Sequence, residues 1–250
     1  MALFTDGNIA NLNDLRAYES SILDLASTEG IDLGAKLALA QREMSFEILA
    51  FLLRRGQLST SRRELNEVVV TEPMLHAHVI STLALIYRDA FNSQLNDRYQ
   101  GKWIQYAELA RRAVKQLLDI GVGLTSTPLQ KPQPPQLDAV TGYGFATTYS
   151  VKIAAVGTSG FSSVASDTNL LDSQAGTNLS VTLPRLPSHA MGFVIYAGST
   201  ESAMARQTEQ PLPENTIWSL PLEGLRSDLA DLVVQSADSY VLNRQEMLRG

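Results

Sequence analysis

The three histidines are the first candidates for chemistry, because imidazole binds metal ions and transfers protons near neutral pH. His76 and His78 stand two positions apart in a segment with helical spacing, so their side chains point roughly 200° apart and cannot share a metal ion. His189 stands alone in a loop beside Pro187. The chain has no cysteine, which removes thiolate ligands, thiolate nucleophiles and disulfides. We therefore expect no metal site.

Carboxylates beside arginines are the second group of candidates. Asp89, Asp97 and Glu108 could act in general acid–base catalysis, but ion pairs with nearby arginines on a helix surface are the simpler interpretation. Gly121-Val-Gly123 and Gly142-Tyr-Gly144 lack the preceding strand and following helix of a phosphate-binding loop. The sequence contains no Gly-x-Ser-x-Gly motif. We expect no catalytic residue, no cofactor and no enzyme activity.

Paired arginines and one tryptophan remain as candidates for binding. A protein that binds nucleic acid usually has a net basic domain or stripe, whereas this chain has a net charge of −6 and neither half is basic. The arginine pairs therefore indicate solvated faces or protein contacts, and the tryptophan indicates a core or a subunit interface. The residues selected in this way as a candidate interface are Arg54, Arg55, Arg62, Arg63, Trp103, Arg111 and Arg112.

Residues 1–126 have the apolar periodicity of amphipathic helices. We expect a first helix capped by Asn13 and ended by Gly30, and a second from about Leu33 to Arg55. The sequence Thr71-Glu72-Pro73 predicts the start of a third helix. The pattern leaves open whether Gln100-Gly101 separates it from a fourth, because one Gly costs only about 1 kcal/mol in a helix.

The predicted second helix carries two apolar stripes. One stripe consists of Leu37, Met44, Ile48 and Leu52, and the other consists of Phe46, Leu49 and Leu53. Two stripes predict that this helix is buried on two sides, either within a bundle or between subunits.

A proline-rich segment divides the chain. Four of the ten prolines lie in residues 127–135, where they fix the backbone and remove hydrogen-bond donors. This composition predicts a stiff, extended connector over residues 127–136 between two folded domains. No stretch approaches the roughly 20 apolar residues that span a bilayer, so we expect no membrane contact.

Short strands with frequent turns are predicted beyond the connector. Residues 147–156, 178–183, 192–197 and 216–220 have the composition and alternation of strands. Residues 161–166 are expected to return from a turn at Gly157–Gly160. Several short strands of this kind indicate a small β-sandwich over residues 137–221.

The helical half resembles the head–tail connector, or adaptor, proteins of tailed bacteriophages. The resemblance lies in LALIYRDAF (Leu83–Phe91), in NDRYQGKWIQYAELARRA (Asn96–Ala113), and in the opening segments Asp14–Tyr18 and Asp24–Gly30. It implies a helical bundle that forms a homo-oligomeric ring, a dodecamer in that family, between the portal protein and a tail or tail-completion protein. DNA would pass through the ring without specific binding. It also implies location at the neck of the virion after synthesis in the host cytoplasm, with the arginines and Trp103 as a portal or subunit interface.

The strand half resembles immunoglobulin-like and fibronectin type III-like domains. Leu179–Thr200 is similar to the B and C strands of the fibronectin type III family, and Tyr149–Ser163 is similar to its F–G hairpin. The F–G-like piece comes first here, so a permuted or Ig-like sandwich is expected. The fold class is therefore α+β in two domains, an N-terminal all-α helical bundle (1–126) and a β-sandwich (137–221).

Residues 222–250 form a C-terminal extension without a firm period. Resemblance to connectors implies that it docks into the neighbouring ring, and the alternative is that it packs against its own domain or frays. The function expected from the sequence is a structural connector of the virion. The alternative is a host-surface or glycan-binding module carried on a helical oligomerisation domain. The strand half is not rich in aromatic residues, which is an argument against this alternative.

Overall fold

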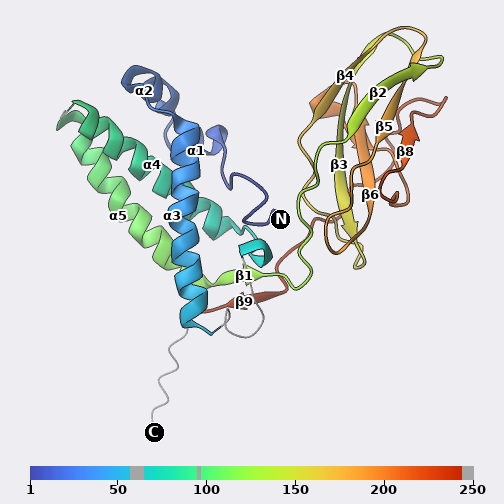
Figure 1. Cartoon of the computed structure of the whole chain (residues 1–250). Helices are drawn as coiled ribbons and strands as arrows, with labels where there is room; N and C mark the ends of the chain where they lie inside the picture. The colour runs from blue at the N-terminus through green and yellow to red at the C-terminus, as the bar shows by residue number, and fades with distance from the viewer. Residues whose placement is uncertain (57–64, 95–96, 244–250) are drawn as a thin grey trace. The chain divides into compact units, whose positions relative to one another are not determined.

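The computed structural model describes residues 1–56, 65–94 and 97–243 (Figure 1). The chain forms two compact units. The helical unit consists of Phe4–Ser126 together with the residues from Ala237 on, and the β unit consists of Met1–Leu3 and Thr127–Ser236. A helical N-terminal region is thus followed by antiparallel sheets, which confirms the predicted α+β class.

Five α-helices make up most of the described part of the helical unit. They are α1 (Leu12–Tyr18), α2 (Ile22–Glu29), α3 (Leu33–Arg54), α4 (Glu72–Gln94) and α5 (Asp97–Ile120), with a short 3-10 turn, η1, at Leu65–Glu67.

The prediction of one helix from Asn13 to Gly30 is wrong, because this segment contains α1 and α2. Asn11 is the cap of α1: its side chain accepts hydrogen bonds from the backbone N–H groups of Asn13 and Asp14, at 2.8 and 3.2 Å. The Asp14 carboxylate in turn accepts from the Asn11 N–H at 2.7 Å, which completes a capping box. The backbone becomes extended at Glu19, and this ends α1.

The other helix boundaries follow local chemistry. Gly30 ends α2 in the left-handed conformation (φ 66°), as its type predicts. Asp32 caps α3 by accepting from the Ala35 N–H at 3.0 Å. Gly101 lies inside α5 with open space around its Cβ position, so Gln100-Gly101 does not separate two helices.

The helical unit holds two hydrophobic clusters. The first includes Leu15, Ile22 and Leu83, and the second includes Ile48 and Leu117. All five side chains are fully buried. Helix α4 packs against both α3 and α5, so α3 and α5 flank it.

A small antiparallel sheet closes the helical unit. Strand β1 (Val122–Leu124) pairs with β9 (Ser239–Val241), which comes from the far end of the chain (Figure 1). Just before β9, the Asp238 carboxylate accepts hydrogen bonds from Thr125 and Ser126, at 2.8 to 3.1 Å. Residues 237–243 of the predicted C-terminal extension thus pack on their own helical unit.

The β unit contains a three-stranded and a four-stranded antiparallel sheet, with orders β2-β5-β8 and β4-β3-β6-β7. Side chains of both sheets share one core, which includes Val151, Ile153, Val181, Phe193 and Ile195, so the sheets form two facing layers (Figure 1). The strands are β2 (Gln136–Thr141), β3 (Thr147–Gly157), β4 (Asn169–Ser173), β5 (Thr177–Thr182), β6 (Ala190–Gly198), β7 (Ala205–Arg206) and β8 (Ile217–Ser219).

Four predicted strands are confirmed as β3, β5, β6 and β8, but the predicted return strand at residues 161–166 is wrong. Ser162 makes two isolated bridges, to Val156 and to Val234, and otherwise residues 161–166 lie outside the ladders. Serine hydroxyls replace part of the strand pairing: the Ala155 N–H donates to Ser163 Oγ at 3.0 Å, and the Ile153 N–H donates to Ser166 Oγ at 3.1 Å. Two closely spaced serine hydroxyls, those of Ser163 and Ser166, therefore satisfy part of the edge of β3 without regular strand geometry.

The proline-rich segment lies against the β unit. Leu129 is buried, and its N–H and C=O groups both bond to the Gln235 side chain, at 3.0 and 2.7 Å. The Pro135 carbonyl accepts from the Asn169 side chain at 3.0 Å. Gln235 belongs to residues 222–236, which pack on the outer side of the four-stranded sheet, where Leu232 contacts a second small cluster. The prolines thus give residues 127–135 an extended path along the unit.

Candidate functional site

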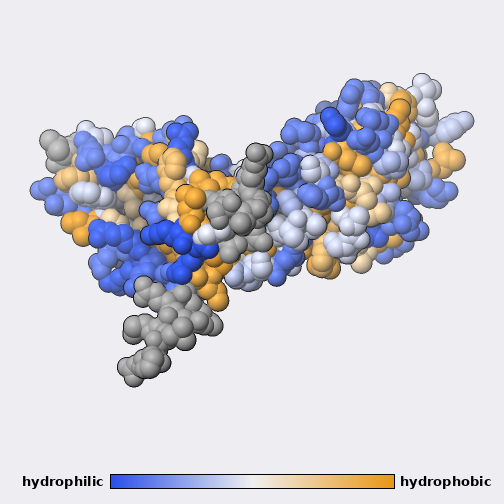
Figure 2. Space-filling view, turned by 60° about the horizontal axis from the view of Figure 1, so that its bottom comes forward, coloured by the Kyte–Doolittle hydropathy of each residue, from blue (hydrophilic) through white to orange (hydrophobic). Residues whose placement is uncertain are grey.

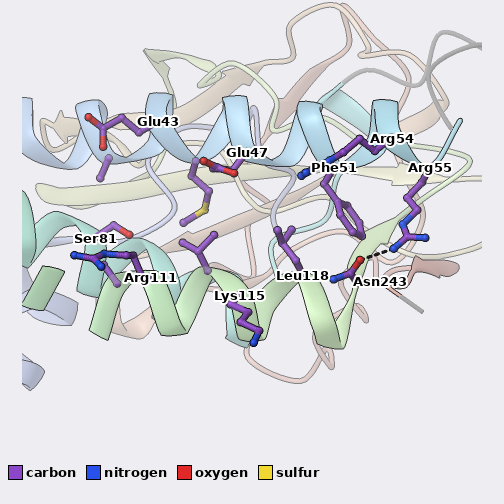
Figure 3. A pocket seen from close by; sticks show the side chains of 14 residues that line it. Glu43, Glu47, Phe51, Arg54, Arg55, Ser81, Arg111, Lys115, Leu118 and Asn243 are labelled. Carbon is purple, nitrogen blue, oxygen red and sulfur yellow. Dashed lines mark hydrogen bonds between the residues drawn. The ribbon is translucent and has the colours of Figure 1, made fainter. Parts of the chain in front are cut away.

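A groove of about 680 Å³ lies between α3 and α5, with Ser81 of α4 at its base (Figure 3). Its floor is apolar because residues four positions apart on a helix share one face. On α5 this spacing places Ala110, Val114 and Leu118 together, and all three are half-buried. Helix α3 contributes the buried side chains of Ala40, Met44 and Phe51.

The two sides of the groove carry opposite charges. Glu43 and Glu47 line it from α3, whereas Arg111 and Lys115 line it from α5 (Figure 3). All four side chains belong to exposed residues. An apolar floor between an acidic and a basic rim suits an amphipathic segment of another protein chain.

Arginines lie at the end of the groove where α3 terminates. Arg54 and Arg55 both line it, and the Arg55 guanidinium lies 5.8 Å from the centre of the Phe51 ring. Arg55 also donates a hydrogen bond to the Asn243 side chain, which in turn donates to Asp119 at 3.1 Å. The segment after β9 therefore fixes Arg55 at this end of the groove.

The opposite side of α3 has an apolar ridge, which we define as Phe46, Leu49 and Leu53. Phe46 and Leu53 are 63% and 62% exposed, and Leu49 is half-buried. At 100° per residue, the ridge lies roughly 140° around the helix from the centre of the groove. Figure 2 shows one face of the molecule, on which hydrophobic side chains of the helical unit reach the surface beside strongly hydrophilic ones. Exposed apolar side chains in a row indicate an interaction surface.

The structure brings together three of the seven residues selected from the sequence: Arg54, Arg55 and Arg111 line the groove. Arg112 forms an i,i+4 ion pair with Glu108 outside this set. Trp103 is half-buried and stacks on Phe91, with ring centres 5.4 Å apart. Arg62 and Arg63 lie outside the described residues.

Sequence reasoning missed the acidic rim and Lys115. The pattern that could have found them is the Ala110-Val114-Leu118 stripe with basic residues one position after its first two members. Such a stripe beside charges predicts the edge of a groove, but the sequence does not show that α3 lies across from it.

A second polar cluster surrounds Glu19, where α1 ends. Its carboxylate accepts hydrogen bonds from Lys102 at 2.5 Å and Tyr106 at 3.0 Å. Burial raises the pKa of this carboxyl group, but the bonds from Lys102 and Tyr106 outweigh that effect and hold the pKa below its usual 4.5. Burial, followed by the bond to Glu19, raises the pKa of Tyr106 to about 12. These shifts move the pKa values of Glu19 and Tyr106 away from neutral pH, which is what a structural cluster would show.

The histidines do not form a site. His78 is fully buried and contacts the Leu37 carbonyl through Nε2 at 3.0 Å, and burial lowers its pKa below 6.5. His76 bonds to the Tyr18 hydroxyl at 2.8 Å. Among the described residues, no three His, Asp or Glu side chains are grouped as metal ligands would be.

Within the same described ranges, no helix has the length and apolar composition needed to cross a bilayer. Comparison of the chain with protein-family models, with curated proteins and with solved structures finds no match.

Proposed function

We propose that this chain is a structural connector protein that assembles into a ring between a portal and a tail. The observation that carries the proposal is the pair of different surfaces on α3, a groove on one side and an apolar ridge on the other. The resemblance of Leu83–Phe91 and Asn96–Ala113 to phage connectors supplies the biological setting.

A closed ring requires a head-to-tail interface in which two different patches of each subunit meet. The ridge of one copy would enter the groove of the next, placing Phe46 and Leu53 on the floor formed by Met44, Val114 and Leu118. Arg42 stands four residues before Phe46 and extends the ridge with a positive charge. It complements the acidic rim of the groove.

The partners follow from the resemblance. We propose a dodecameric ring that contacts the portal protein on one side and a tail or tail-completion protein on the other. Arg54, Arg55 and Arg111 serve the subunit or portal interface. DNA passes through the lumen, and the net charge of −6 accords with passage without specific binding.

The β unit is proposed to be a permuted immunoglobulin-like sandwich. Two features support this: β5, the B-like strand, lies in one sheet, while β6 and β3, the C-like and F-like strands, are neighbours in the other. In the chain the F-like strand precedes the B-like strand. Such a unit would brace or decorate the ring.

The mass of the purified chain in solution tests the ring interface. The double variant Phe46→Ser/Leu53→Ser removes two exposed apolar side chains, so the helical unit should keep its helical circular dichroism while assemblies dissociate. The matched control is Ile104→Ser/Leu109→Ser, which changes two exposed apolar residues of α5 outside the groove. Dissociation in the control alone, or in neither variant, contradicts the proposed ridge.

Charge reversal tests the groove from the other side. Arg111→Glu/Lys115→Glu should strengthen assembly, because Arg42 of the ridge would then meet acidic side chains on both rims of the groove. Arg16→Glu/Arg88→Glu makes the same change in charge at exposed positions outside the groove and should assemble as the unmodified chain does. Equal effects of the two variants would show that net charge, not the groove, controls assembly.

A further inference from the structure

The loop between β2 and β3 presents two aromatic side chains to solvent. Tyr143 is 87% exposed and Phe145 is 85% exposed, and no other large hydrophobic side chain of the described residues is as exposed. Among the described residues, neither side chain stacks on another aromatic ring or forms a side-chain hydrogen bond. Exposing two neighbouring aromatic side chains to water costs free energy. A role in binding would explain why both are exposed.

The backbone of this loop is fixed, so the exposure does not result from fraying. The Gly142 N–H donates to the Gly176 carbonyl at 2.9 Å, and the Gly176 N–H donates to the Gly144 carbonyl at 2.8 Å. A Cβ atom at Gly144 would lie 2.0 Å from the Thr177 carbonyl oxygen, and one at Gly142 would lie 2.7 Å from Asn178. Only glycine fits at these two positions.

The alternation of glycine and aromatic residues gives the loop two sides. Both glycines press against Thr177 and Asn178, so the residue after each of them is free to extend outward. The backbone hydrogen bonds and close glycine contacts therefore fix the positions from which Tyr143 and Phe145 extend. Preorganised rings bind a ligand at a lower cost in conformational entropy than rings on a flexible loop.

The chemistry around the rings is polar and nearly uncharged. The segments that meet here, residues 136–151 and 169–180, contain no Lys or Arg and only two acids, Asp138 and Asp172. The absence of basic residues in these segments argues against a ligand bound through its phosphate charge.

We infer that the Gly142–Phe145 loop binds neutral sugar rings. The C–H groups on one face of a pyranose carry partial positive charge and lie favourably on the negative face of an aromatic ring. Two rings two residues apart would hold neighbouring units of an oligosaccharide. This site belongs to the β unit alone and does not depend on ring assembly.

Binding to a panel of immobilised neutral oligosaccharides tests the inference. The full chain is applied to cellohexaose, maltohexaose, mannohexaose and chitohexaose, alongside Tyr143→Ala/Phe145→Ala. The matched control is Phe161→Ala/Leu222→Ala, two other exposed apolar residues of the β unit. We expect binding to at least one sugar, a loss of at least about tenfold in affinity in the loop variant, and an unchanged affinity in the control.

Three results would overturn the inference: no binding to any of the four sugars, equal binding by the loop variant, or an equal loss in the control. Vesicles of phosphatidylcholine serve as a further probe, because exposed aromatics also enter lipid interfaces. Loop-dependent binding to vesicles but not to sugars would assign the loop to a membrane surface and refute the sugar site. Circular dichroism of each variant establishes that the β unit remains folded.

Discussion

Replacing Gln235 with alanine should destabilise the β unit strongly, although this residue stands outside every strand. Its side chain bonds to both backbone polar groups of Leu129, at 3.0 and 2.7 Å. Leu129 is only 2% exposed and Gln235 only 4% exposed. The variant therefore leaves one buried N–H and one buried C=O without their present partner.

The size of the effect follows from these two groups. A buried polar group that loses its partner costs about 1–3 kcal/mol, so two predict a loss of about 2–6 kcal/mol in the free energy of unfolding. With a urea dependence of about 2 kcal/mol per molar, the unfolding midpoint should move down by about 1–3 M.

Tryptophan fluorescence can follow the β unit separately. The chain has two tryptophans, Trp103 in α5 and Trp218 in β8, so a Trp103→Phe background leaves only the reporter in the β unit. Urea titrations then compare Gln235→Ala with the control Gln133→Ala. Gln133 is an exposed glutamine of the proline-rich segment that contains Leu129. Gln133→Ala should be within about 0.5 kcal/mol of the background.

Equal midpoints for Gln235→Ala and Gln133→Ala would refute the reasoning. That result would mean that the proline-rich segment is held by other contacts, and that its extended path does not depend on residues 222–236.

Three further predictions concern single side chains. Burial lowers the pKa of His78 below 6.5, although the bond to Leu37 and the charge of Asp14 oppose this, so the unfolded chain binds a proton more readily than the folded chain. As the pH decreases below about 6.5, the free energy of unfolding should therefore decrease, by at most about 1.4 kcal/mol per pH unit. Thermal melts should show a smaller decrease in His78→Gln. Gly144→Ala should lower the stability of the β unit by at least about 2 kcal/mol in urea titrations, because its Cβ would approach β5 closely. The control Gly101→Ala has open space at its Cβ and should stabilise α5 by about 0.5–1 kcal/mol. Unchanged stability of Gly144→Ala would contradict the close approach to β5. Glu19→Gln should cost the helical unit about 1–3 kcal/mol by weakening the bonds to Lys102 and Tyr106, and an unchanged melting temperature would contradict the assigned cluster.

Helices were predictable where capping residues and apolar spacing agree. The start of α4 at Glu72 and the end of α2 at Gly30 follow from Thr71, Pro73 and the left-handed preference of glycine. The break between α1 and α2 was missed, because apolar spacing continues through it. The break depends on Glu19, whose partners Lys102 and Tyr106 lie more than eighty residues away.

The strands were predictable from alternation, but their partners were not. Residues 147–156 alternate clearly and form β3, whereas β9 has only three residues and exists because β1 lies beside it. The turn at Gly157–Gly160 also predicted a returning strand at residues 161–166, since a turn does not show whether the chain pairs through its backbone or through hydroxyl groups.

The candidate site was predictable only in part, for a similar reason. The arginines at the end of α3 and on α5 stand out in the sequence, but a groove requires two helices to be placed side by side. The second stripe of α3 was predicted to be buried within the bundle or between subunits, and Phe46 and Leu53 are exposed in the single chain. The contact between subunits that we propose would bury this ridge.

Negative-stain microscopy of the purified chain, alone and mixed with a portal protein, tests the central claim most directly. The proposed function predicts closed rings, with one ring attached to each portal vertex, and loss of both in Phe46→Ser/Leu53→Ser. Particles of single chains in both samples, at concentrations where circular dichroism shows a folded protein, would contradict it.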